Sequence, residues 1–251
     1  PSTGLGCGST RAIPQFSRRI IMKFDSYSIS ARIFPAILSS VPFFVLHFYY
    51  LRPTLGQFWA ELLAAQIVSD ITIVLVFVFL LIQVNRYVSK EFFEKRMFVD
   101  GLYLPTTNYL LHLDSHFSLE YTAKIHAKIK TDFDINIPSA KDEEADAQQS
   151  RKLISEAVGQ IRTKVGDGRL VSQHNAEYGF SRNLAGGAII AFMVSLVDIA
   201  VFGFIFYNLT AFWLSVIIAV IYLLLVLFSK KIIFAFGNSY AQKLIEEYMA
   251  K

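Results

Sequence analysis

The sequence predicts an all-α membrane protein with four transmembrane helices in two antiparallel hairpins and a mainly helical cytosolic domain inserted between them. Three observations predict this fold. The mean hydropathy is +0.44, with 54% hydrophobic and 18% charged residues. The apolar residues are concentrated in four blocks, and a single sizeable polar region separates the second block from the third. Such a distribution is typical of a polytopic membrane protein.

The stretch 67–84 is the clearest membrane span. It contains no charged residue from Ile71 to Ile82, and roughly 18 to 20 helical residues cross the hydrocarbon layer. A buried helix of a soluble protein is seldom apolar on every face for so long. Asp70 breaks the pattern, and an ionisable group at this depth is costly unless it faces protein or water. Asp70 therefore indicates a polar seam in this span.

The remaining hydrophobic blocks predict three further spans. The first covers 33–51, where Pro35 and Pro42 are expected to bend the helix. The third covers 184–207 and the fourth 212–228, with short outer turns at 54–57 and 208–211. The predicted parts of the chain are thus a disordered leader or expression remnant (1–21), the first hairpin (22–85), the cytosolic domain (86–183), the second hairpin (184–229) and a cytosolic amphipathic tail (230–251). A native basic N-terminal tail that lies on anionic lipid is the alternative for 1–21.

The polar region predicts several short elements. Residues 105–130 favour short helices, because Pro105 suits a first helical turn and Leu119, Ala123 and Ile125 recur at helical spacing. Weak alternation predicts a short strand at 133–137. The acidic segment 139–150 is interpreted as an exposed loop. The segment 151–165 places its apolar residues on one face and predicts an amphipathic helix.

Basic residues near the span ends predict the orientation. Nine of them lie on one side of the predicted membrane: Lys23, Arg32, Arg86, Lys90, Lys95, Arg96, Arg182, Lys230 and Lys231. Arg52 is nearly alone on the other. The positive-inside rule then predicts a multi-pass protein with both termini and the polar domain in the cytoplasm.

Acidic residues within the spans are the main functional candidates. In the antiparallel arrangement Asp70 and Asp198 lie in the outer half of the membrane, with Glu61 above them at the interface. One interpretation is an ion pathway, in which a ring of acids in an oligomeric pore favours cations. The alternative is structural, with each aspartate hydrogen-bonded to nearby serine, threonine or histidine side chains. A proton relay is the third interpretation.

The polar region offers weaker candidates. Lys124, Lys128, Lys130 and Arg162 could hold the phosphates of a nucleotide or oligonucleotide, although a solvated surface explains them as well. His112 and His116 are one helical turn apart, but no third ligand stands at a diagnostic spacing. No metal site, cofactor or catalytic centre is predicted, so the protein is not interpreted as an enzyme.

The chain also resembles a known group of proteins. Through Pro105-Thr106-Thr107, His126 and the run from Glu177 to Leu184 it resembles a bacterial family of small membrane proteins. Its layout is similar to that of transmembrane effectors of bacterial antiphage systems, among them the channel-forming effector of the Hailong type. This resemblance implies a nucleotide-gated oligomeric channel in the inner membrane, controlled by a signal from a partner nucleotidyltransferase. It assigns no functional residue.

Two functions are therefore expected. The first is a homo-oligomeric ion channel or membrane-disrupting effector, taken as a tetramer in membrane lipid and gated through its cytosolic domain. The second is a non-conducting membrane scaffold whose cytosolic helices recruit a partner. A proton-coupled transporter ranks third, because the sequence contains no clear inverted repeat.

Overall fold

The computed structural model describes residues 26–56, 58, 70–99, 101–166 and 168–251; in the helix that begins at Asp70, side chains are described from Val74 onward. Over these residues every regular element is a helix and no strand occurs. The elements are α1 (Ser26–Ser28), η1 (Ile29–Ile33), α2 (Phe34–Ser39), α3 (Val41–Leu46), η2 (His47–Leu51), α4 (Arg52–Thr54), α6 (Asp70–Ser89), η3 (Lys90–Glu94), α7 (Lys95–Phe98), α8 (Pro105–Asn108), α9 (Leu119–Phe133), α10 (Ala140–Ala145), α11 (Ala147–Val165), α12 (Arg169–Ala200), η4 (Val201–Ile205) and α13 (Leu209–Ala250). The all-α prediction is confirmed for the described residues.

Three helices are long and apolar enough to cross a membrane: Ser26–Thr54, Arg169–Ile205 and Leu209–Ala250. These helices support the prediction of a transmembrane protein. The remaining predicted span corresponds to α6, but its first residues lie outside the described part of the chain, as does Glu61. The number of four spans and their arrangement in two hairpins therefore stay predictions.

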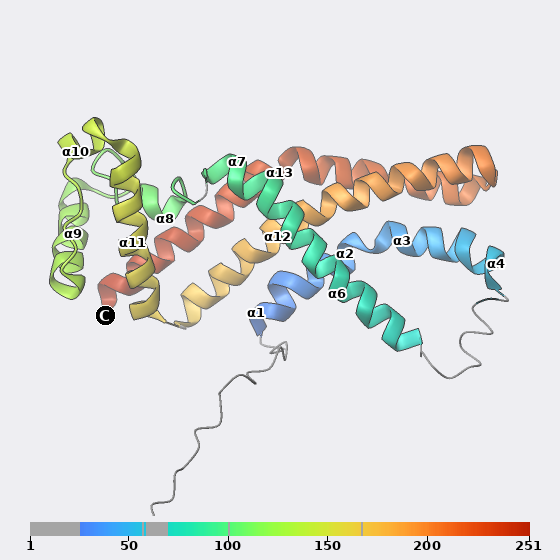
Figure 1. Ribbon diagram of the computed structural model, residues 1–251, viewed down its shortest axis with the longest axis horizontal. Coiled ribbons are helices and arrows are strands. Elements are labelled where there is room, and N and C mark those ends of the chain that lie inside the picture. The colour runs from blue at the N-terminus through green and yellow to red at the C-terminus, as the bar shows by residue number, and fades with distance from the viewer. Residues whose placement is uncertain (1–25, 57, 59–69, 100, 167) are drawn as a thin grey trace, which may run out of the picture.

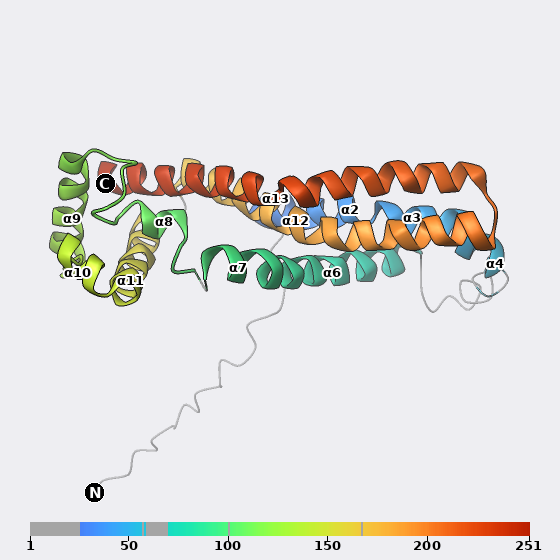
Figure 2. The same ribbon diagram turned by 90° about the horizontal axis from the view of Figure 1, so that it is seen from above.

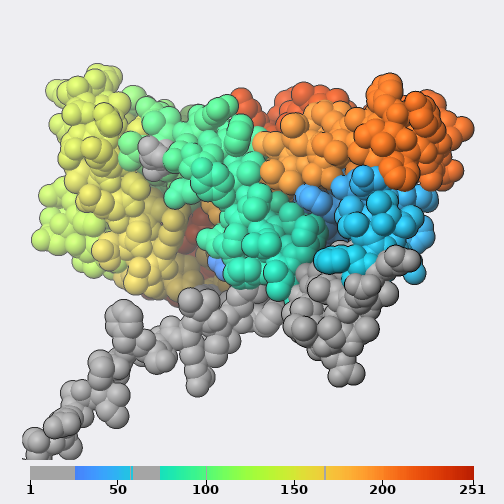
Figure 3. All heavy atoms as spheres, turned by 45° about the vertical axis from the view of Figure 1, so that its right-hand side comes forward, coloured from blue at the N-terminus to red at the C-terminus, as the bar shows by residue number. Residues whose placement is uncertain are grey.

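The helices α12 and α13 form the long axis of the molecule (Figures 1 and 2). They run antiparallel from a tight turn, where the Asn208 side chain caps α13 by accepting a hydrogen bond from the amide of Ala211 at 3.1 Å. The α2 and α6 helices pack against α12. In the space-filling view α6 and α7 cross the middle of the visible face (Figure 3). The helices α2, α6, α7, α12 and α13 are together called the bundle below.

The first helix is interrupted beside the second of its two prolines. Pro42 has no amide hydrogen to donate, and the helix is interrupted at Ser40, between α2 and α3. The hydroxyl of Ser40 donates to the carbonyl oxygen of Ile37 at 2.6 Å, so this side chain satisfies a backbone acceptor beside the interruption. The helix then continues to Thr54.

Residues 101–166 form a polar domain at one end of the bundle, where the C-terminus also lies (Figure 1). Its core contains Ile125 and Ile129 of α9 together with Ile154, Ile161 and other residues of α11. The end of α13 completes this core with Tyr240, Ala241, Leu244, Ile245 and Tyr248. The predicted tail is thus continuous with the fourth span in one helix and packs into the polar domain.

Two local predictions in the polar domain are wrong. The expected strand at 133–137 does not form, because α9 runs to Phe133 and Asp134 ends it in the left-handed conformation at φ 56°. The expected loop at 139–150 contains α10 and the start of α11. The side chains of Ser139 and Asp146 cap these two helices by accepting hydrogen bonds from backbone amides. Acidic residues in a first turn favour a helix start, which explains the error.

The other helices of the polar domain form where the sequence predicts them, but the predicted buried face of α9 is not correct at every residue. Pro105 occupies the first turn of α8, and α11 buries its apolar face. In α9 the buried residues are Thr122, Ile125 and Ile129. Leu119, which was expected on the apolar face, is 77% exposed.

Candidate ligand pocket between the bundle and the polar domain

A cavity of about 150 Å³ lies where the polar domain meets the bundle. Its walls come from six helices, α1, η3, α8, α11, α12 and α13, and from the segment before α8. The lining residues are Tyr27, Glu94, Leu104, Pro105, Thr106, Arg162, Asn175, Tyr178, Gly179, Arg182, Gly237 and Tyr240. Because α12 and α13 both contribute, the cavity is bounded by the same helices that form two of the candidate spans.

Arg162 brings a positive charge to this cavity. Its Nη2 donates to the hydroxyl of Thr106 at 3.3 Å, and its guanidinium lies 5.8 Å from the ring centroid of Tyr240. Within the described residues Arg162 forms no ion pair with an acid. A guanidinium presents several N–H donors in a fork that matches carboxylate and phosphate oxygens. Arg162 therefore leaves donors for an anion.

A second arginine, Arg182, also lines the cavity. Arg182 pairs with Glu94 at 2.9 Å and lies 5.7 Å from the ring centroid of Tyr178. The hydroxyl of Tyr178 is buried and has no hydrogen-bond partner in the described part of the chain. The cavity thus combines one neutralised arginine, one without an acidic partner and one free hydroxyl. This set suits a small anion, such as a phosphate group.

Two glycines let the walls of the cavity come close together. A Cβ atom on Gly179 would lie 2.9 Å from Cβ of Ala31 and 3.1 Å from the hydroxyl oxygen of Tyr27. A Cβ atom on Gly237 would lie 3.4 Å from Pro105 and from Tyr178. The first glycine therefore allows the N-terminal helix to contact α12, and the second allows α8 to contact α13.

Of the four predicted ligand residues only Arg162 lines this cavity. The three lysines are each paired with an acid on α9 or at its end: Lys124 with Glu120, Lys128 with Asp132 and Lys130 with Asp134. The structure does not bring the four together, because Arg162 lies on another side of α11 from Lys164, the α11 residue that contacts Asp132.

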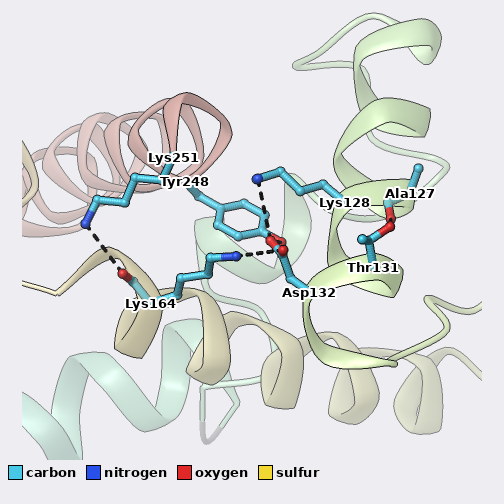
Figure 4. A network of polar contacts seen from close by, with 7 residues as sticks. All are labelled: Ala127, Lys128, Thr131, Asp132, Lys164, Tyr248 and Lys251. Carbon is cyan, nitrogen blue, oxygen red and sulfur yellow. Dashed lines mark hydrogen bonds and ion pairs between the residues drawn. The ribbon is translucent and has the colours of Figure 1, made fainter.

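The pair Lys128–Asp132 belongs to a network that anchors the end of α13 (Figure 4). Asp132 receives hydrogen bonds or ion pairs from Lys164 at 2.6 Å, from the hydroxyl of Tyr248 at 2.9 Å and from Lys128 at 3.6 Å. The hydrogen bond from Lys164 is the main cause that holds the pKa of Asp132 below its usual value. Lys251 contacts the carbonyl oxygens of Lys164 and Val165. This network is structural, because its side chains contact one another and join α9, α11 and the end of α13.

The predicted acids of the spans are only partly described. Asp198 is fully buried in α12, and neither of its carboxylate oxygens has a hydrogen-bond partner among the described residues. Ser195 and Ser215 are also fully buried, but their hydroxyls donate to carbonyl oxygens of their own helices at 2.8 Å. Asp70 is the first residue of α6, and its side chain lies outside the description.

The histidines of the polar domain pack against aromatic rings. The ring of His116 stacks on Tyr109 with centroids 3.8 Å apart, and that of His112 lies 4.6 Å from His126. Burial lowers the pKa of His126, whose Nε2 lies 2.8 Å from the carbonyl oxygen of Leu110. The described residues contain no group of three or more side chains that could hold a metal ion. These histidines therefore pack against aromatic rings, His112 and His126 while partly buried and His116 while exposed.

Sequence reasoning missed most of the cavity. Glu94, Tyr178, Arg182 and Tyr240 were not identified as site residues; Arg182 entered the prediction of orientation and, with Tyr178, the run that carries the resemblance. The one usable signal was the arginine and tyrosine of the run Glu177 to Leu184, two polar residues on one helix next to a span. Comparison with known proteins adds no assignment: no family model, curated protein or solved structure matches this chain.

Proposed function

We propose that the protein is a homo-oligomeric ion channel, or a membrane-disrupting effector, whose conductance is set by an anionic ligand in the pocket between the bundle and the polar domain. The observation that carries this proposal is the continuity of α12 and α13, which line the pocket and run on as candidate membrane spans. A change at the pocket is thereby coupled directly to the membrane helices.

The two arginines of the pocket, Arg162 and Arg182, explain how an anionic ligand could stabilise one arrangement of the helices. Arg162 belongs to α11 of the polar domain, whereas Arg182 belongs to α12. A phosphate group that accepts hydrogen bonds from both would hold α11 and α12 together, because it binds a side chain of each helix. A ligand shifts an equilibrium only by binding one state better than the other, and a bridging anion meets that requirement.

The resemblance noted in the sequence guides the biological setting. In this proposal the channel lies in the bacterial inner membrane, both termini face the cytoplasm and the channel acts in antiphage defence. The ligand is then a nucleotide or oligonucleotide made by a partner nucleotidyltransferase. Asp198 and Asp70 favour cations in the pathway, since acidic side chains at a constriction attract positive ions.

A flux measurement with Arg162 variants tests the proposal. The full chain is reconstituted in liposomes, and cation flux is recorded as inorganic pyrophosphate, a minimal phosphate ligand, is titrated. Loss of one charge-assisted hydrogen-bond partner costs roughly 1.5–3 kcal/mol. Arg162→Gln is therefore expected to raise the pyrophosphate concentration needed for half of the full effect by about tenfold or more. Arg169→Gln, which removes an exposed arginine outside the pocket, is the matched control. Equal responses of wild type and Arg162→Gln would contradict the assigned pocket.

A second candidate function is a non-conducting scaffold that recruits a cytosolic partner. The full burial of Asp198 within a single chain favours it, because a residue on the lumen between subunits is expected to be exposed in one protomer. Under this hypothesis, over-expression leaves the membrane potential unchanged and liposomes that contain the protein do not leak. Measurements of the membrane potential and of liposome leakage therefore distinguish this scaffold from the channel.

A further inference from the structure

The interruption of the first helix involves a side chain from another helix. Pro42 has no amide hydrogen, so it cannot donate to the carbonyl oxygen of Leu38, four residues earlier. The hydroxyl of Tyr222, from α13, donates to this oxygen. Tyr222 is buried, and its ring packs in a core with Val45 and Phe202. Tyr222 therefore supplies the hydrogen bond that the proline removes.

Two serines of the first helix serve the neighbouring carbonyl oxygens. The amide of Ser40 is shared among the three carbonyl oxygens of residues 36–38, so it cannot satisfy all of them fully. The hydroxyl of Ser39 donates to Ala36 at 3.1 Å, and that of Ser40 donates to Ile37 at 2.6 Å. Three successive carbonyl oxygens thus each accept from a hydroxyl group, and only the oxygen of Leu38 receives it from another helix.

A third helix also contacts the interruption. Nδ2 of Asn85, on α6, donates to Oγ of Ser39 at 2.8 Å. Both side chains are buried, where a lost hydrogen bond is not replaced by one to water. The backbone at the interruption is therefore tied to α6 and to α13 by one hydrogen bond each.

The interruption separates two halves of the first helix, which changes direction between α2 and α3 (Figure 1). The pocket half, 26–39, packs on α12 and contributes Tyr27 to the wall of the pocket. The far half, 41–54, packs at the opposite end of α12, where the ring of Tyr50 meets that of Phe206 edge to face at 4.6 Å. The bend between the halves must therefore suit both contacts at once.

We propose that Tyr222 is a positioning residue for the pocket: its hydrogen bond to Leu38 holds the bend that places Tyr27 in the pocket wall. Tyr222 lies outside the residues that line the pocket, so it acts through the first helix. The inference rests on the proposed ligand pocket and adds a residue remote from it. Because the ligand contacts a wall that the bend positions, the affinity of the pocket and the angle of the bend are linked.

A double-mutant cycle between Tyr222 and Pro42 tests this role. Tyr222→Phe keeps the ring and removes only the hydroxyl. Pro42→Ala returns an amide hydrogen that can donate to Leu38, so the hydroxyl is no longer required in that background. Ser215→Ala is the matched control, because it removes a buried hydroxyl of α13 that donates to a carbonyl oxygen of its own helix.

Two measurements are made on the full chain in lipid bilayers. The first is the distance between nitroxide labels on the two halves, introduced by Ile29→Cys and Phe48→Cys in a Cys7→Ser background. These positions are 38% and 57% exposed, so the labels do not disturb the core. The second is the binding of radiolabelled pyrophosphate at equilibrium, measured without the labels. Neither measurement depends on ion conduction.

With the native proline, Tyr222→Phe is expected to broaden the distance distribution and to raise the dissociation constant of pyrophosphate by about threefold or more, the size of one lost hydrogen bond. In the Pro42→Ala background the same substitution is expected to change neither quantity. Ser215→Ala is expected to leave both at their wild-type values.

Three results would overturn the inference. The first is a distance distribution that Tyr222→Phe leaves unchanged. The second is an effect of equal size in both backgrounds, since it would assign the role of Tyr222 to its packing alone. The third is an altered distance with unaltered pyrophosphate binding. A wild type that binds no pyrophosphate contradicts the proposed ligand, and the distances in the four variants of the cycle then decide whether Tyr222 holds the bend.

Discussion

At the residue scale, the best-defined contact outside the bundle is the one between Asp132 and the end of α13. The Tyr248 side chain is fully buried, and its hydroxyl reaches a carboxylate that also binds Lys164 and Lys128. A hydrogen bond to a charged acceptor is among the stronger kinds in proteins. This contact therefore fixes the position of α13 in the polar domain.

Removal of the Tyr248 hydroxyl is expected to loosen that position without disturbing the core. In Tyr248→Phe the ring still packs, but one charge-assisted hydrogen bond is lost, which lowers the free energy of unfolding by about 1–2 kcal/mol. Thermal unfolding in detergent measures the change. Tyr87→Phe, at a position 67% exposed, is the control and is expected to leave the Tm unchanged. A Tm of Tyr248→Phe equal to that of the wild type would contradict the anchoring role.

The depressed pKa of Asp132 predicts a dependence of stability on pH. Because the folded state favours the charged carboxylate, chiefly through Lys164, the stabilising contribution is present above the pKa of an unfolded aspartate, about 3.9. It is lost as the pH falls through the lower folded pKa. Asp132→Asn is therefore expected to have a lower Tm than the wild type at pH 7 and a smaller deficit below about pH 4. Asp134→Asn changes an exposed carboxylate with a single lysine partner, so we expect it to show a smaller deficit at pH 7. A deficit for Asp132→Asn that is the same at both pH values would refute the assignment.

At the element scale, what the sequence could predict depended on how local each signal is. Hydropathy predicted the two long helices α12 and α13, and periodicity predicted α11, because both signals lie within one segment. Ser139 and Asp146 could also be recognised in the sequence as residues that commonly cap helices, but the acidic segment around them was interpreted as a loop. The pocket was not predictable. Arg162 and Arg182 are brought together by the packing of α11 on α8 and α13, and no spacing in the sequence encodes that packing.

The close contact of α12 with α6 gives a prediction at this scale. In Gly186→Ala the new Cβ would meet the carbonyl oxygen of Asn85 at 2.3 Å, so the two helices must move apart. Such overpacking typically costs about 1–3 kcal/mol, measured as a lower Tm in detergent. Gly159→Ala on α11 is the matched control, since nothing lies within 4 Å of its added Cβ. Alanine is the better helix former, so this control is expected to gain about 0.5–1 kcal/mol. Equal effects of the two substitutions would show that the contact is not tight.

At the scale of the whole molecule, α12 and α13 link the polar domain to the membrane bundle. The polar domain encloses the end of α13 in its core (Figures 1 and 2). The pocket lies where the two parts meet. A ligand between Arg162 and Arg182 would therefore act on the same helix that carries the unpaired acid. This arrangement is the physical basis of the proposed control of conductance.

The central claim is that cations pass through this protein under the influence of its buried acid. The reversal potential of reconstituted wild type and Asp198→Asn across a potassium chloride gradient tests it most directly. The wild type is expected to show a potential close to that of a cation-selective pathway. Asp198→Asn is expected to shift this potential toward zero, because the substitution keeps the shape of the side chain and removes its charge. A wild type that passes no current with or without pyrophosphate, or an Asp198→Asn variant with unchanged cation preference, would contradict it.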